Sequence, residues 1–132
     1  MPTRAQVEDW AERYRKAWVE RDPEAAAALF TDAAGYRSNI YEEPHRGRPG
    51  VVAYWADVTA SQGDLEVRMG QPLVEGSRAD VEFWTTMSVD GSPMTLAGCL
   101  LLDFDDDGRC RDLREYWNIA EGTLQPPMGW GT

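Results

Sequence analysis

Glu115 and Tyr14 are the residues whose types and surroundings could support acid–base chemistry. Glu115 alternates with Leu113 and Trp117 on the more apolar of the two faces of its stretch. If this face is turned inward, burial can raise the pKa of the carboxyl group strongly and make it a candidate general acid or base. Tyr14 lies one helical turn before Trp18, and a buried phenol needs a hydrogen-bond partner or a ligand. We therefore predict Glu115 as a catalytic residue and consider Tyr14 as a candidate hydrogen-bond donor beside it.

Each of these two residues also has an interpretation without a chemical role. Glu115 could lie at the mouth of a cavity, or it could pair with Arg37, Arg68 or Arg114. Tyr14 could belong only to the core, since an apolar stripe at helical spacing is first of all a packing surface. The sequence leaves these alternatives open.

The sequence lacks the residue sets that nucleophilic triads, disulfide frameworks and metal sites require. His45 is the only histidine, and it follows a polar Glu-Glu-Pro segment, which favours a solvated surface histidine over a catalytic one. Cys99 and Cys110 lack the spacing of metal ligands and are too few for a disulfide framework. The acidic run 103–107 is expected to be a solvated turn, because it lacks further oxygen ligands for a metal. We expect neither a metal nor a cofactor.

The charge of the chain excludes several classes of partner. Lys and Arg number 13 and Asp and Glu number 23, so the net charge is −10. Such a surface repels phosphate backbones and anionic lipid headgroups, so we expect neither nucleic acid nor a membrane as partner. The N-terminus has no apolar segment of the kind found in signal peptides, and we expect a cytoplasmic protein.

The hydrophobic periodicity changes from helical to strand-like along the chain. A capping box of Thr3 and Gln6 begins a helix that continues to Trp18, and Asp22-Pro23 begins a short second helix that leads into Phe30. A third helix begins at Val51 and stops near residue 63. Strands are predicted over residues 35–41, 65–69, 79–89, 94–105 and 109–119, with hairpin turns at 90–91 and 106–108.

Helices first and a strand meander afterwards predict a single α+β domain over residues 1–132. We expect three N-terminal helices on one face of a curved, mainly antiparallel sheet, with a pocket between the two layers. Only residues 122–132 look irregular, and Trp130 in this tail could fold back over the open end of the domain.

Strand alternation also predicts which side chains line the pocket, although one bulge would invert the assignment downstream. The expected ligand-binding residues are Trp18, Ser38, Tyr54, Trp55, Phe83, Thr85, Met87, Leu100, Leu102, Leu113 and Trp117. The opposite face would carry Trp84, Arg114 and Tyr116, and exposed aromatic side chains on a sheet indicate that another surface covers them.

The order of these elements resembles the nuclear transport factor 2-like superfamily over nearly the whole chain. The likeness is carried by Arg13-Tyr14 on the first helix, Leu29-Phe30 after the second, and the last strand, residues 109–118. More narrowly, the segment from Arg13 to Gly47 looks like the ketosteroid isomerases, and residues 114–118 are similar to the closing strand of SnoaL-like proteins. This resemblance implies a deep cavity inside a cone-shaped sheet and a homodimer that pairs through the outer sheet face.

Two of the key residues of the isomerase site have no chemical equivalent at the corresponding positions of this sequence. By the resemblance, Tyr14 corresponds to the family's oxyanion-binding tyrosine and Trp55 to a supporting tyrosine. The family's aspartate base falls on Ser38, and its second oxyanion donor falls on Leu100. Serine without a neighbouring histidine is a poor base, and leucine donates no hydrogen bond. Steroid isomerisation by that mechanism is therefore not expected.

Three functions remain open. The first is a cofactor-free isomerase, lyase, cyclase or epoxide-hydrolase-like enzyme that acts on a small apolar molecule, with Glu115 and Tyr14 at its centre. The second is a binding protein that holds a hydrophobic ligand unchanged. The third is an association domain whose cavity is filled by its own tryptophan side chains. A missing Asp-Arg-Asp relay on the strands argues against the best-known epoxide hydrolases of the resembled fold.

Overall fold

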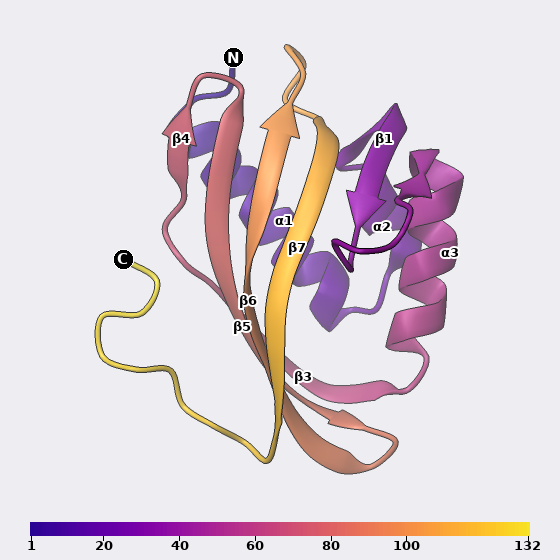
Figure 1. The fold of residues 1–132 in the computed structure, drawn as a ribbon, viewed down its shortest axis with the longest axis vertical. Coiled ribbons are helices and arrows are strands. Elements are labelled where there is room, and N and C mark those ends of the chain that lie inside the picture. Colours follow the sequence, from indigo (N-terminus) through magenta and orange to yellow (C-terminus); the bar gives the residue numbers. More distant parts are fainter.

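The computed structural model describes all 132 residues as helices packed on one face of a curved, open sheet (Figure 1). The helices are α1 (Arg4–Val19), α2 (Pro23–Ala27) and α3 (Gly47–Thr59). The strands are β1 (Phe30–Arg37), β2 (His45–Arg46), β3 (Gln62–Met69), β4 (Leu73–Glu75), β5 (Arg78–Val89), β6 (Ser92–Phe104) and β7 (Cys110–Glu121). The predicted α+β class is confirmed.

The sheet is mixed. Its strand order is β2-β1-β7-β6-β5-β3, with β4 paired to β5 at one side. All pairs are antiparallel except β1 with β7, which are parallel. This pair sets the first strand of the chain beside the last strand of the chain. This pairing places a strand from near the N-terminus next to the strand that carries Glu115.

The first two helices begin where the sequence indicates. The side chain of Thr3 accepts from the amide of Gln6, and the Gln6 side chain accepts from the amide of Thr3, which completes the capping box. Asp22 caps α2, and Pro23 occupies its first turn. The second helix ends at Ala27, because Phe30 already belongs to β1 and pairs with Cys110.

Several boundaries differ from the sequence prediction. β1 spans residues 30–37 instead of 35–41, because its buried side chains pack inward while it pairs with β7. Residues 42–50, between the predicted strand and the predicted third helix, contain β2 and the first turn of α3, which begins at Gly47. The short β4 was not predicted, and β3 begins three residues before the expected strand.

The long hairpins match the sequence prediction. Asp90 and Gly91 both have positive φ angles, 50° and 85°, which suits a tight turn between β5 and β6. The pairing of β5 with β6 runs without interruption along the whole hairpin. In the β6–β7 pair, the only irregularity lies between Asp103 and Phe104, so side-chain alternation is preserved around Glu115.

That alternation turns the expected faces inward. Val81, Phe83 and Thr85 of β5 are fully buried against the helices, as are Leu100 of β6 and Leu113 of β7. The core between the two layers is rich in aromatic rings, and Trp10 of α1 packs against the rings of Tyr14, Phe30 and Phe104. Most of the space between helices and sheet is therefore filled.

The C-terminal tail packs against the sheet. It turns over the outer face of the sheet, where the Trp130 ring makes an edge contact with Trp84 at a centroid distance of 6.0 Å. The Arg68 guanidinium lies over the Trp130 ring at 5.3 Å, and the Trp84 indole donates to the Leu124 carbonyl at 3.0 Å. Folding back of Trp130 over the open end of the domain was one possibility, but the ring lies on the outer face, where Trp84 offers it an aromatic partner.

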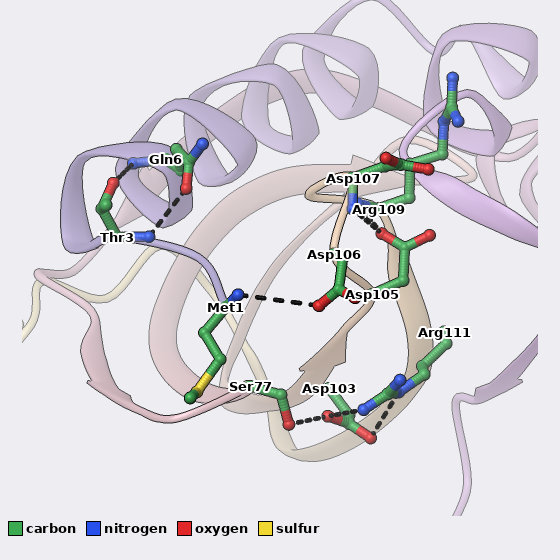
Figure 2. A network of polar contacts seen from close by, with 10 residues as sticks. All are labelled: Met1, Thr3, Gln6, Ser77, Asp103, Asp105, Asp106, Asp107, Arg109 and Arg111. Atoms are coloured by element: carbon green, nitrogen blue, oxygen red, sulfur yellow. Dashed lines mark hydrogen bonds and ion pairs between the residues drawn. The ribbon is translucent and has the colours of Figure 1, made fainter.

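The acidic run at the β6–β7 turn is used to build that turn (Figure 2). One oxygen of Asp105 accepts from the amides of Asp107 and Arg109. Asp103 pairs with Arg111 at 2.9 Å and accepts from the Ser77 hydroxyl at 2.7 Å. These carboxylates therefore have structural partners within and beside the turn.

None of the helices has the length and apolar character that a membrane crossing requires.

Candidate functional site

A small cavity of about 40 Å³ lies between the helices and the inner face of the sheet. Its walls come from α1, α3, β1, β3, β6 and β7. The lining residues are Tyr14, Trp18, Tyr36, Tyr54, Trp55, Val58, Thr59, Gln62, Leu96 and Glu115. A space of this size holds a few water-sized groups, which makes it far smaller than the deep pocket that the resemblance implied.

Glu115 is the only ionisable carboxyl group in this lining. Its place on β7 directs it inward, and the residue is 8% exposed. None of the chain's six ion pairs includes it, so the alternative of an arginine partner is wrong. Burial raises the pKa of Glu115 to about 8, and hydrogen bonds from Tyr36 and Tyr14 oppose this rise only in part.

Two phenols complete a polar cluster around this carboxyl group. The Tyr36 hydroxyl donates to Oε1 of Glu115 at 3.5 Å, and it shares a hydrogen bond of 3.0 Å with the Tyr14 hydroxyl. Burial and the nearby Glu115 charge hold the pKa of Tyr14 well above its usual value, and burial and the neighbouring Tyr14 do the same for the pKa of Tyr36. Both phenols are therefore neutral hydrogen-bond donors over the physiological pH range.

Tyr54 supplies a third phenol from α3. Its ring packs against Tyr36 at 5.2 Å and stacks on the His45 imidazole at 4.5 Å. Burial raises its pKa, and so does the Glu115 charge, while a hydrogen bond with Ser38 lowers it. The cavity is thus lined by neutral donors and aromatic rings, with a single carboxyl group among them.

The structure brings together five of the residues predicted for the site. Glu115, Tyr14, Trp18, Tyr54 and Trp55 all line the cavity. They converge because α1 and α3 lie on the inner face of the sheet beside β1 and β7 (Figure 1).

The other predicted ligand-binding residues lie outside the lining of the cavity. Phe83, Thr85, Met87, Leu100, Leu102 and Leu113 are buried in the core, where they pack against neighbouring side chains. Ser38 follows β1 directly and contributes through its hydroxyl to the environment of Tyr54. Trp117 is 43% exposed, and its indole donates to the Ser38 carbonyl at 2.6 Å.

Sequence reasoning missed Tyr36, the residue that joins Glu115 to Tyr14. It also missed Val58, Thr59, Gln62 and Leu96. The signal for Tyr36 was its place on a predicted strand, but only the parallel pairing of β1 with β7 sets it opposite Leu113 and within reach of Glu115. Gln62 accepts from the Trp18 indole at 2.9 Å, a contact between distant segments that no local pattern indicates.

Nowhere in the chain do three or more His, Cys, Asp or Glu side chains converge as metal ligands. The polar groups of the cavity are joined by hydrogen bonds among Tyr14, Tyr36 and Glu115. A carboxyl group that is neutral near pH 7 can donate a proton to an oxygen atom, and adjacent phenols can stabilise the charge that develops.

Residues 11–113 match the family model of the SnoaL-like domain. The chain belongs to this family. No protein among the curated sequences matches it.

The SnoaL-like fold of the chain is shared by solved structures of low sequence identity. One is a hypothetical protein with a ketosteroid isomerase-like fold from Catenulispora acidiphila, in complex with trimethylamine, with 17% identity, a TM-score of 0.74, and coverage of 82% of this chain and 84% of that one. Another is an LEH-like epoxide hydrolase from M. tuberculosis, with 18% identity, a TM-score of 0.71, and coverage of 86% and 84%.

A third structure is SalBIII, an epoxide hydrolase/cyclase-like enzyme with a role in pyran ring formation in the polyether salinomycin. It is 14% identical, with a TM-score of 0.79, and the match covers 92% of this chain and all of that one. At these identities the likeness establishes the fold, and the chemistry of the SnoaL-like chain has to be argued from its own residues.

Proposed function

We propose that this protein is a cofactor-independent acid–base enzyme whose reacting group is Glu115. The observation that carries the proposal is a nearly buried carboxyl group without an ion pair, hydrogen-bonded to a phenol on the wall of an aromatic cavity. Its pKa of about 8 keeps most Glu115 side chains protonated at pH 7. A general acid with a pKa close to the working pH contributes about 10²- to 10⁴-fold in rate.

The substrate class that suits this site is a neutral molecule with an ether or carbonyl oxygen. Glu115 would donate its proton to that oxygen as the C–O bond of an epoxide opens, or as a carbonyl enolises. The attacking hydroxyl group or the acidic carbon then returns one proton to the carboxylate, so the reaction needs no net proton. Tyr14 and Tyr36, which are neutral donors, would stabilise the negative charge on oxygen in the transition state.

Two of the structural neighbours support epoxide opening as the reaction within this class. One is described as an epoxide hydrolase and the other as an epoxide hydrolase/cyclase-like enzyme. The present cavity has a single carboxyl group instead of a relay of several charged residues. Such a site fits an isomerisation or an internal ring closure, in which the substrate supplies its own nucleophile.

The replacement Glu115→Gln tests the proposal. Turnover of a panel of epoxides that carry an internal hydroxyl group should fall at least about a hundredfold, because an amide cannot donate a proton of comparable acidity. The matched control is Glu121→Gln, an exposed acid on the same strand, and it should keep full activity. Equal turnover by wild type and Glu115→Gln, with both folded by circular dichroism, would contradict the proposal.

A second candidate function is the binding of a small organic cation without reaction. Five aromatic side chains surround the cavity, and such rings attract ammonium groups. A neighbour of the same fold holds trimethylamine. Tetramethylammonium, whose charge is fixed, distinguishes the two candidates, because cation binding would tighten as Glu115 ionises between pH 7 and pH 9. A hydrogen-bonded neutral substrate would instead bind more weakly as the pH rises.

A further inference from the structure

An apolar strip continues from the cavity along the inner face of the sheet. We define this strip by Leu96 of β6 with Trp117 and Ile119 of β7. The register of the two strands, which is regular in this part of the pair, places Leu96 opposite Ile119 and Gly98 opposite Trp117. Since Leu113 and Glu115 point inward, Trp117 and Ile119 lie on the same face two and four residues further along the strand.

The strip is exposed although it lies on the inner face. Trp117 is 43% exposed and Ile119 is 50% exposed, whereas Leu113 on the same face is fully buried. The strands extend beyond the helices at this end of the molecule (Figure 1). The Trp117 ring is held in place by its hydrogen bond to the Ser38 carbonyl at 2.6 Å.

Leu96 connects the strip to the cavity, because it lines the cavity and stands directly opposite Ile119. Side chains that face each other across an antiparallel pair have Cβ atoms roughly 5 Å apart. A molecule whose end occupies the cavity can therefore continue over Leu96 onto Trp117 and Ile119 without leaving apolar surface.

The cavity is also too small to hold a whole metabolite of ordinary size. Pockets for small molecules commonly measure about 300 to 1,000 Å³. The present cavity of about 40 Å³ accommodates only a head group. The apolar remainder of such a ligand needs a surface that is continuous with the cavity, and the strip is one.

We propose that the strip binds the apolar chain of an elongated substrate whose oxygen-bearing head enters the cavity. This inference rests on the proposed function for the direction of the head toward Glu115. The ligand class is a neutral, linear molecule with one terminal oxygen function and an alkyl chain. It is held by hydrogen bonding at the head and by apolar contact along the chain.

A homologous series of 2-alkanones, from 2-butanone to 2-decanone, tests the strip by calorimetric titration at pH 6, where Glu115 is protonated. Each methylene group that rests on the strip should tighten binding by up to about fourfold, since a fully buried methylene contributes about 0.8 kcal/mol. In Ile119→Asn, this dependence on chain length should weaken while 2-butanone binds as it does to wild type. Ile119 is exposed, so the replacement should leave the fold intact.

The matched control is Leu73→Asn, an exposed leucine on β4 at the other end of the sheet, which should leave the whole series unchanged. Affinities independent of chain length, no binding of any ketone, or a series unaffected by Ile119→Asn would each overturn the proposal. Conversion of a wild-type dimer into a monomer by Ile119→Asn would also overturn it, because the strip would then be a contact between copies. If wild-type affinity depends on chain length and Glu115→Gln is as active as wild type, the strip is a binding surface but Glu115 is not the reacting group. Only the catalytic proposal would then be refuted.

Discussion

At the scale of single residues, the Glu115 carboxyl group sets the pH behaviour of the protein. Its pKa in the folded chain is about 8, against an ordinary value of 4.5. Below pH 4.5 both the folded and the unfolded chains carry the proton, so this group does not affect stability. Between pH 4.5 and 8 the unfolded chain ionises first and binds fewer protons, so the free energy of unfolding falls as the pH rises.

The expected loss is about 1.4 kcal/mol for each pH unit across this window, and it levels off above pH 8. The change Glu115→Gln removes the titrating group, so urea unfolding of this variant should lack that part of the pH dependence and should give a more stable protein than wild type at pH 9. Parallel stability curves for the two proteins between pH 5 and pH 9 would show that Glu115 titrates normally.

Side-chain alternation was enough to predict the inward direction of Glu115 and Leu113, but it could not reveal the partners of Glu115. Tyr36 reaches the carboxyl group through the pairing of two strands that lie far apart in the sequence. The size of the cavity could not be predicted from the sequence either, because it depends on how the rings of Tyr14, Trp18 and Trp55 pack against each other.

At the scale of elements, the hairpins of β5, β6 and β7 were predictable because their turns carry strong local signals and their strands alternate cleanly. β1 was placed too late in the chain. Its first half is polar at Thr31 and Asp32, and its boundaries are fixed by pairing with β7 and not by local pattern. Local signals therefore specify the meander, while long-range pairing specifies the strand that carries Tyr36.

The close contact of β6 with its neighbours β5 and β7 depends on Gly98. A Cβ atom at this position would overlap the Tyr116 carbonyl oxygen and would meet the Phe83 ring at 2.8 Å. We predict that Gly98→Ala destabilises the protein by about 1–3 kcal/mol in chemical denaturation, because both the β7 backbone at Tyr116 and the Phe83 ring would have to move. Ala97→Val, the adjacent change on the outer face, should stay within about 0.5 kcal/mol. Equal stabilities for the two variants would show that the ring has room to move.

At the scale of the whole molecule, the tail divides the outer face of the sheet into two regions. Trp130 and Leu124 cover Trp84 on β5. The region around Tyr116 on β7 is left exposed. An exposed aromatic side chain on a sheet face suits contact with another protein surface.

We propose that two copies pair through this uncovered region of the outer face. Light scattering should then give a dimer for wild type and a monomer for Tyr116→Asp, since a buried unpaired charge opposes association. Tyr41→Asp, the same change at an exposed loop tyrosine, should remain dimeric. A monomeric wild type at micromolar concentration would refute the pairing.

The most direct test of the acid–base centre is a titration of Glu115 itself by carbon NMR of the side-chain carboxyl group, with the signal assigned by its loss in Glu115→Gln. The buried cluster predicts a midpoint near pH 8 in the folded protein. A midpoint at or below the ordinary value of 4.5 would contradict the central claim, because the carboxyl group would then be ionised and could not act as the proton donor at neutral pH.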